Sequence, residues 1–313
     1  MSLVTPPEVS IVIVNFDTND FVLECLYSIF VLNEDVDTEV IVIDNSSTDQ
    51  SVKSIEQFFP TVKLIQNSSN IGFAAASNKG LCLTSGEFVL LLNPDTFLPC
   101  SSLRKCIDYL KKNPEIGLLT PKLIKPDGSL DWACKRSFPT PADLLLRMLK
   151  LDRLFPDSKF FGHYSLSYLD SNKSTEVECI AGAFMLARRK AVDVVGLLDE
   201  SFFLYFEDLD WSYKFNVLKW KVFYYSEVVV WHYKRGATRK HESFAIKQFY
   251  YALYQGYFKY YGDNNPIFNY IFKFIVYLRM ILSLAVSTLI NTSPFYIYNE
   301  YRNKKLIKNF KFN

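Results

Sequence analysis

The chain has 313 residues, 49% of them hydrophobic and 22% charged, so it can bury a sizeable core and lacks the composition of a disordered protein. Its formal net charge of +2 argues against a strongly basic nucleic-acid binder, and we expect no nucleic-acid partner. Six scattered cysteines without a CxxC pair are typical of buried thiols in a reducing compartment. No signal-peptide pattern opens the chain, so we expect a cytoplasmic protein.

The first half of the chain alternates short apolar runs with helical patterns. The runs at residues 9–14, 40–43, 62–65 and 88–92 predict buried strands, because they are short and rich in aliphatic residues. The intervening residues 20–32, 49–59 and 72–84 predict helices, with Ser47 or Thr48 as the N-cap of the second. This alternation is typical of an α/β fold whose mostly parallel sheet carries helices on both faces.

The second half is less regular at first. Residues 117–175 contain several prolines, and residues 125–128 predict a hairpin turn. Strands are expected again at 179–187, 222–225 and 228–231, and a helix at 208–218. We therefore predict one large domain over residues 1–240, followed by a helical, aromatic and basic extension over residues 241–313.

Three carboxylates follow predicted strands of the first half. Asp17, Asp44 and Asp95 each come shortly after an apolar run, and parallel sheets bind ligands at the carboxyl ends of their strands. The chain has neither GxGxxG after a strand nor a P-loop motif, so a phosphate ligand would need another way to offset its charge. The rigid segment Asn93-Pro94-Asp95 offers one, because a carboxylate there can hold Mg²⁺ or Mn²⁺ against a diphosphate.

A second carboxylate cluster opens the predicted helix at 208–218. Helical spacing places Asp208 on the apolar side with Trp211 and Phe215, where a carboxylate needs a partner or a function. The alternative is that Asp208 only caps the helix. Glu207 and Asp210 lie on the other side, where solvated surface charges are as good an interpretation as functional groups.

His232 follows the predicted strand at 228–231. A lone histidine in that position is more often structural than a metal ligand. Asp95 cannot complete a metal site alone, however, and this chain has only three histidines. His232 is therefore a candidate second ligand.

An ordered series of sequence blocks resembles family 2 glycosyltransferases of the GT-A fold, particularly the bacterial rhamnosyltransferase-like branch. The matching blocks are residues 9–16, 42–49, 70–80, 91–96, 136–141, 182–186, 196–210 and 231–238. They span residues 9 to 240 in the order of the family. The resemblance implies a GT-A catalytic domain over residues 1–240, with a mixed, mostly parallel sheet, and a C-terminal helical extension.

The resemblance also implies a role for each site residue. Binding of the nucleotide-sugar donor is implied for Asn15, Asp17, Asp44, Asn45, Gly72, Asn78, Lys79, Asn93 and Asp95. Metal binding, to Mg²⁺ or Mn²⁺, is implied for Asp95 and His232. Asp208 is implied as the general base. Acceptor binding is implied for Arg136, Gly182, Ala183, Glu207 and Asp208.

The sequence departs from the family pattern at three positions. Asn93 stands where the DxD motif has its first Asp, which is common in this branch. Leu198 stands where Phe is usual, a hydrophobic exchange that should be tolerated. Asp17 stands where Asn is common, which could alter the contacts with the base or ribose of the donor.

The implied activity is inverting, metal-dependent, non-processive transfer of one sugar to a glycan acceptor, which we expect to be lipid-linked and part of cell-surface polysaccharide biosynthesis. The resemblance favours dTDP-L-rhamnose as donor, followed by UDP-galactofuranose or another UDP-hexose. A sugar-1-phosphate nucleotidyltransferase is less favoured, because its glycine-rich loop is missing after the first strand. A processive synthase would carry QxxRW and several membrane spans, and a non-catalytic module would not need Asp95, Asp208 and His232 together.

The extension leaves two interpretations open. Residues 274–290 are apolar apart from Arg279 and a few hydroxyls, which is short for a membrane span. The segment either packs on the core or in a homodimer, or lies on the inner face of the cytoplasmic membrane as a peripheral element. A basic tail would assist the second arrangement; its residues are Arg302, Lys304, Lys305, Lys308 and Lys311.

Overall fold

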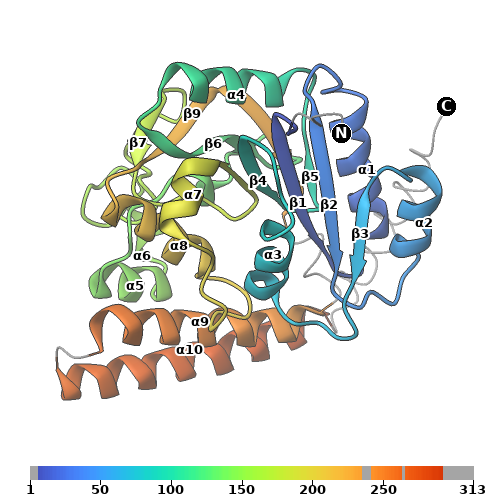
Figure 1. The fold of residues 1–313 in the computed structure, drawn as a ribbon. Helices are drawn as coiled ribbons and strands as arrows, with labels where there is room; N and C mark the ends of the chain where they lie inside the picture. Colours follow the sequence, from blue (N-terminus) through green and yellow to red (C-terminus); the bar gives the residue numbers. More distant parts are fainter. Residues whose placement is uncertain (1–5, 235–240, 263–264, 292–313) are drawn as a thin grey trace. The chain divides into compact units, whose positions relative to one another are not determined.

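The structure is a computed structural model that describes residues 6–234, 241–262 and 265–291. The chain divides into two compact units, residues 1–239 and 240–313 (Figure 1). Two features of the sequence lie outside the described residues, namely the block at 236–238 and the basic tail at 302–311.

In the described part of the first unit, nine strands form one mixed sheet in the order β3-β2-β1-β4-β8-β6-β9-β5, with β7 paired to β9. The strands are β1 (Val9–Asn15), β2 (Thr38–Asp44), β3 (Lys63–Gln66), β4 (Phe88–Leu92), β5 (Thr96–Phe97), β6 (Ile116–Ile124), β7 (Thr175–Val177), β8 (Phe184–Arg188) and β9 (Lys221–His232). Pairing is parallel from β3 to β4 and between β6 and β9, and antiparallel elsewhere. The predicted mixed, mostly parallel α/β sheet is confirmed.

Helices cover both faces of this sheet. They are α1 (Asn19–Phe30), α2 (Ser51–Phe58), α3 (Phe73–Leu81), α4 (Ser102–Lys112), α7 (Arg189–Val195) and α8 (Glu207–Val217). Helices α5 (Pro141–Met148) and α6 (Leu151–Leu154) contact each other, and the 3-10 turn η1 (Trp132–Cys134) contacts β6. Crossovers between parallel strands are right-handed. Helix α1 connects β1 to β2 and α2 connects β2 to β3, toward the β3 edge of the sheet. Helix α3 connects β3 to β4 in the opposite direction, so it lies on the opposite face (Figure 1).

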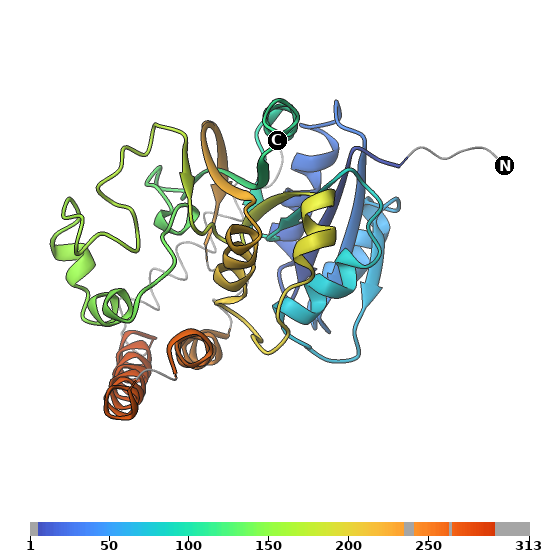
Figure 2. The ribbon, with the colours of Figure 1, turned by 60° about the vertical axis from the view of Figure 1, so that its left-hand side comes forward.

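The core is centred on the parallel strands, whose apolar runs are buried on both faces. Ile11 and Ile13 of β1 are fully buried, as is Leu90 of β4. Helix α3 approaches the sheet closely, because a Cβ at Gly80 would lie 2.4 Å from Cγ1 of Val12. Figures 1 and 2 show this parallel half at one side of the first unit and the loop-rich segment with α5 and α6 at the other.

Three local predictions need correction. Strand β8 begins at Phe184, and Cys179 forms only an isolated bridge with Arg136. Residues 222–231 are one strand, because polar residues that resemble a turn are accommodated by a register shift opposite Pro121 and Lys122. Helix α2 is capped at Gln50, without a side-chain bond, since the loop before it bonds to β1 and its following turn. The hairpin turn at 125–128 is confirmed by the Gly128 N–H, which donates to the Lys125 carbonyl at 2.8 Å.

The described part of the second unit consists of the helices α9 (Glu242–Tyr261) and α10 (Pro266–Asn291), which pack antiparallel. The Tyr257 ring stacks on Phe272 at 3.8 Å, and the Tyr250 hydroxyl lies 2.8 Å from that of Ser283. Within the described residues, the 24 residues Pro266–Leu289 form one helix long and apolar enough, by length and composition, to cross a membrane.

Candidate active site

The ends of β1 and β2 meet at one edge of the sheet, next to the point where the chain reverses direction to reach β4. Asn15 and Asp44 pair in parallel register, and Asn15 Nδ2 donates to Asp44 Oδ1 at 2.7 Å. Both side chains are buried. Open α/β sheets bind ligands at such a reversal, so the predicted donor edge has the expected topology.

Asp17 and Asp44 both shape the loop that follows β2. Asp17 has a φ of +54°, and its Oδ1 accepts the Thr48 N–H at 2.7 Å and the Asp49 N–H at 3.2 Å. Asp44 Oδ2 accepts the Ser47 N–H at 2.9 Å. The two carboxylates therefore hold the loop in place, and direct contacts of either with a nucleotide stay a prediction.

A polar chain runs from β2 to α3. Asn45 Nδ2 donates to the Gly72 carbonyl at 3.1 Å, and Asn67 Nδ2 donates to Asn45 Oδ1 at 2.9 Å. The exposed Lys79 donates to Asn67 Oδ1 at 2.6 Å, which fixes a positive charge at the carboxyl edge of β3. A cation at that edge is compatible with the predicted role of Lys79 near the donor phosphates.

Asn78 has a different environment. Its buried amide donates to the Leu198 carbonyl and to Glu200 Oε1, both at 2.9 Å, and its Oδ1 accepts the Leu198 N–H. Both amide protons thus have acceptors in the loop that precedes α8. Asn78 thus joins α3 to the loop before α8, and its contact with the donor stays a prediction.

Asp95 and His232 lie beside each other. Asp95 follows β4, and Thr96 pairs with His232 across β5 and β9, which brings His232 Nε2 to 3.4 Å from Asp95 Oδ1. Both side chains are nearly buried. Within the described ranges no group of three or more His, Cys, Asp or Glu side chains is arranged to hold a metal ion, and metal binding by Asp95 and His232 stays a prediction. A carboxylate and an imidazole suit Mn²⁺ or Mg²⁺ when phosphate oxygens and water complete the shell.

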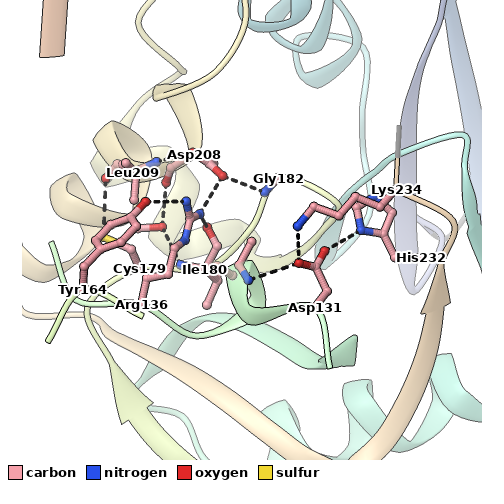
Figure 3. Close-up of polar contacts among 12 residues, drawn as sticks. Asp131, Arg136, Tyr164, Cys179, Ile180, Gly182, Asp208, Leu209, His232 and Lys234 are labelled. Atoms are coloured by element: carbon pink, nitrogen blue, oxygen red, sulfur yellow. Dashed lines mark hydrogen bonds and ion pairs between the residues drawn. The ribbon is translucent and has the colours of Figure 1, made fainter. Parts of the chain in front are cut away.

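Asp131 is a site residue that the sequence analysis missed. Its Oδ2 lies 2.8 Å from His232 Nδ1, and its Oδ1 bonds Lys234 Nζ (Figure 3). Burial lowers the pKa of His232, but hydrogen bonds to Asp131 and Asp95 outweigh burial and raise that pKa to about 9. Burial raises the pKa of Asp131, yet His232 and Lys234 together hold it well below its ordinary value.

Asp208 lies in the first turn of α8, where its Oδ2 accepts Arg136 Nη2 at 2.7 Å and the Gly182 N–H at 3.1 Å (Figure 3). Its side chain keeps 15% exposure, whereas that of Asp210 has 0%. Glu207 is buried as well, so the interpretation of Glu207 and Asp210 as solvated charges is wrong. Of the three carboxylates, Asp208 reaches the surface most, as a proton acceptor must.

Arg136 is buried against Asp208, not extended toward solvent. It also donates to the Ile180 carbonyl at 2.6 Å and to the Tyr164 hydroxyl at 3.2 Å. Burial lowers the pKa of Arg136, but the adjacent Asp208 outweighs this and raises it above the ordinary value, so the guanidinium stays charged. Arg136 thus orients Asp208. Contact of Arg136 with an acceptor stays a prediction.

The backbone at residues 182–183 joins the two clusters. Gly182 donates its N–H to Asp208, and the Ala183 carbonyl accepts the Asn93 N–H at 3.0 Å. Asn93 begins the loop that carries Asp95. In Figure 3, Gly182 lies between the Asp208 and His232 clusters. The predicted base and the predicted metal ligands are therefore connected through the two residues that precede β8. These are the predicted acceptor-binding residues Gly182 and Ala183.

Comparison with known proteins identifies the family of the chain. The family model described as "Glycosyl transferase family 2" matches residues 10–196. The chain is 28% identical over 213 residues to the N-acetylglucosaminyl-diphospho-decaprenol L-rhamnosyltransferase of Mycobacterium tuberculosis, covering 64% of this chain and 67% of that one. It is 22% identical to the low-salt glycan biosynthesis hexosyltransferase Agl10 of Haloferax volcanii, covering 66% of this chain and 61% of the relative.

Solved structures show the same fold. The mannosyltransferase of Pyrobaculum calidifontis, in complex with GDP-Man and Mn²⁺, aligns with a TM-score of 0.55 at 15% identity over 98% of this chain and 82% of that one. GalNAc-T7 with UDP, GalNAc and Mn²⁺ aligns with a TM-score of 0.53 at 16% identity, over 72% of this chain and 43% of that one. Because the family model spans more than half of the chain, the protein belongs to glycosyl transferase family 2, whose inverting enzymes transfer a sugar from a nucleotide-sugar donor to a glycan acceptor on a GT-A fold.

Proposed function

We propose that this enzyme transfers one L-rhamnose, non-processively, from dTDP-L-rhamnose to a lipid-linked glycan acceptor in cell-surface polysaccharide biosynthesis. The observation that carries the catalytic part is the link from Asp208 through Gly182 and Ala183 to the loop of Asp95. The choice of sugar and acceptor is supported by the mycobacterial relative, which is an L-rhamnosyltransferase named for a decaprenol-linked acceptor.

Asp208 acts as the general base in this proposal. Its Oδ2 forms an ion pair with Arg136 and accepts the Gly182 N–H, so two donors hold that oxygen in place. As the acceptor oxygen bonds to the anomeric carbon, Asp208 takes the hydroxyl proton, and the bond from that carbon to the diphosphate oxygen breaks. Attack from the face opposite the diphosphate inverts the anomeric centre, and no covalent sugar–enzyme intermediate is needed.

Asp95 and His232 are the residues that would hold Mg²⁺ or Mn²⁺. A bound divalent cation supplies neutralisation of the charge that develops on the departing diphosphate. Asp95 is positioned for this by the turn between β4 and β5, and His232 by its pairing opposite Thr96. The nearly buried setting of both side chains strengthens their attraction to a cation, because little water screens it.

Replacement of Asp208 tests the catalytic proposal. We expect Asp208→Asn to lower turnover by roughly a hundredfold or more, the usual scale for a lost acid–base group. Donor affinity, measured by calorimetry with Mn²⁺ present, should stay within a few-fold of wild type. Asp210→Asn is the matched control, since Asp210 lies in the same helix but pairs with Lys214. Near-normal turnover of Asp208→Asn in folded protein would place the base elsewhere.

A panel of donors tests the proposed sugar. We expect turnover, or slow hydrolysis without acceptor, to be fastest with dTDP-L-rhamnose among dTDP-L-rhamnose, UDP-galactofuranose and UDP-glucose. Preference for a UDP sugar would overturn the choice of donor and leave the role of Asp208 intact. Release of pyrophosphate from a nucleoside triphosphate and a sugar 1-phosphate would instead indicate a nucleotidyltransferase.

We further propose that the second unit places the enzyme on the inner face of the cytoplasmic membrane. Helix α10 packs one side on α9, yet Phe274 and Ile281 on its other sides are each 60% exposed. Residues 240–313 contain ten Lys and Arg against three Asp and Glu, a net charge of +7. An exposed apolar helix within a basic segment suits an anionic lipid surface, where a lipid-linked acceptor resides. Cosedimentation with anionic vesicles tests this placement.

A further inference from the structure

The contacts that join His232 to Asp131, and Asp131 to Lys234, go beyond the two expected metal ligands. We propose that Asp131 is a positioning residue that fixes the His232 ring so that Nε2 presents its lone pair toward Asp95 and the cation between them. This inference rests on the proposed metal site of Asp95 and His232.

The contacts of Asp131 hold its carboxylate from several sides. Its Oδ2 lies 2.8 Å from His232 Nδ1, and its Oδ1 accepts the Ala133 N–H at 3.2 Å as well as Lys234 Nζ. The Asp131 N–H donates to the Leu123 carbonyl at 2.9 Å, which ties the residue to β6. The side chain is 1% exposed. Asp131 is therefore a fixed acceptor and has little freedom to become a ligand itself.

The bond to Nδ1 decides which ring nitrogen can bind a cation. A neutral imidazole carries its proton on one nitrogen, and only the other has a lone pair. Asp131 and Asp95 both present acceptors to the ring, but Asp131 Oδ2 lies 2.8 Å from Nδ1, whereas Asp95 Oδ1 lies 3.4 Å from Nε2. In the neutral ring the closer contact therefore favours the proton on Nδ1, and Nε2 is the nitrogen left to bind a cation beside Asp95. Carboxylate partners of metal-bound histidines orient the ring and raise its basicity in this way.

Lys234 completes the arrangement. The ammonium of Lys234 bonds Asp131 Oδ1 and neutralises part of the negative charge that Asp131 and Asp95 bring to the two sides of His232. Its side chain is 43% exposed, so it connects the buried carboxylate to solvent. Asp131 lies in the loop that follows β6, and His232 lies at the end of β9, with Lys234 just after it. The pairing of Ile124 of β6 with Trp231 of β9 brings these two segments together.

Binding of Mn²⁺ measures the effect. We expect Asp131→Asn to weaken Mn²⁺ binding by about 10- to 100-fold, the usual range for loss of such an outer partner. The loss of free Mn²⁺ signal in electron paramagnetic resonance, with saturating UDP or dTDP, reports this affinity without any turnover. Asp143→Asn is the matched control, because Asp143 Oδ2 also lies 3.0 Å from a histidine Nδ1, that of His163, in a different part of the unit.

Two further variants separate the possible failures. If Asp95→Ala and His232→Gln leave Mn²⁺ binding unchanged, or if wild type binds none, the proposed metal site itself is wrong. If both weaken binding but folded Asp131→Asn does not, only the positioning role of Asp131 is wrong.

The ring of His232 gives a second readout that needs no variant at Asp131. In ¹⁵N spectra of the wild-type protein, at a pH where the ring is neutral, His232 should carry its proton on Nδ1. The chain has three histidines, so His232→Gln assigns the signal. A proton on Nε2 would overturn the proposal even if Asp131→Asn failed to fold.

Discussion

Glu207 is a buried carboxyl beside a buried ion pair, and its environment disfavours ionisation. Burial raises its pKa well above the ordinary value, the neighbouring Asp208 raises it further, and Arg136 offsets only part of this. Within the described residues, Glu207 Oε2 has no hydrogen-bond partner. The folded protein therefore keeps a proton on Glu207 that the unfolded chain would lose near pH 4.5.

This proton makes the stability of the first unit depend on pH. Because the folded-state pKa lies above the unfolded one, the stabilising proton is fully present below pH 4.5 and lost as pH rises through the folded pKa. Between those limits, stability should fall by up to about 1.4 kcal/mol per pH unit. Glu207→Gln should remove that slope, so its advantage over wild type in urea unfolding should grow from pH 5 to pH 8. A constant difference across that range would show that Glu207 is ionised when folded.

Arg136 and Asp208 should depend on each other in the same assay. Arg136→Met leaves Asp208 as an uncompensated, largely buried charge, and breaking a buried pair in this way destabilises proteins by about 3–5 kcal/mol. Adding Asp208→Asn removes that charge, so the double variant should recover part of the loss. A double-mutant cycle from urea unfolding measures the coupling; strictly additive effects would show that the 2.7 Å contact contributes nothing.

The loop before α8 is fastened to α3 at two points. Asn78 bonds Leu198 and Glu200, and the Phe73 N–H donates to the Phe203 carbonyl at 2.7 Å. The loop then enters α8 through two consecutive left-handed residues with φ of +70° and +71°, Tyr205 and Phe206. Each costs roughly 1 kcal/mol or more, so the surrounding packing must hold them. The first turn of α8, and with it Asp208, thus takes its position from α3.

Gly72 tests this dependence of α8 on α3. A Cβ at Gly72, whose φ is +89°, would lie 2.6 Å from the Phe203 carbonyl oxygen, so Gly72→Ala must displace the loop. We expect turnover to fall about tenfold or more, as displacement of a positioned group commonly does. Gly128→Ala is the matched control, because Gly128 also has a positive φ, +77°, but nothing lies within 4 Å of its Cβ position. Equal turnover of both variants would show that the position of the loop before α8 does not affect catalysis.

Sequence patterns located the elements that carry the site because those elements are local. The strands before Asn15, Asp44 and Asp95 have unbroken apolar runs, and their common edge follows from parallel pairing. The other half of the sheet was harder to predict, since β6, β8 and β9 pair across long separations in the sequence. In addition, β9 contains a bulge whose residues resemble a turn. Asp131 lies 101 residues from His232, and no periodicity connects them.

The sequence also did not predict which polar groups are buried. Helical spacing put Asp210 on the outer side of α8, but the residue is fully buried, with Lys214 as a partner, and α8 contacts α7, β6 and β9. A single-helix pattern describes one interface, whereas α8 has neighbours on more than one face. The same limit applies to Arg136, whose partners come from three separate segments.

At the scale of the whole molecule, charge and apolar surface are unevenly distributed. Residues 240–313 carry a net charge of +7, while the whole chain has only +2, so residues 1–239 are acidic, with a net charge of −5. The second unit also contains a long apolar helix, in which an 18-residue window within Pro266–Leu289 has a mean hydropathy of 1.7. Salt-sensitive attraction and apolar insertion should therefore act in the same unit.

These two contributions can be separated on vesicles. The full chain should bind vesicles containing anionic lipid more tightly than neutral ones, and high salt should weaken the difference because it screens lysine and arginine. Phe274→Asn and Ile281→Asn should together weaken binding by more than about tenfold at every salt concentration, since each removes a side chain whose burial contributes roughly 1.5–3 kcal/mol when complete. Val194→Asn on α7 is the control, because Val194 is similarly exposed, at 64%, but lies in the first unit. Protein that resists alkaline carbonate extraction would instead have α10 across the bilayer. If the chain ignores anionic vesicles at low salt, and sedimentation equilibrium gives a dimer that Ile281→Asn dissociates, the exposed side of α10 is a protein interface.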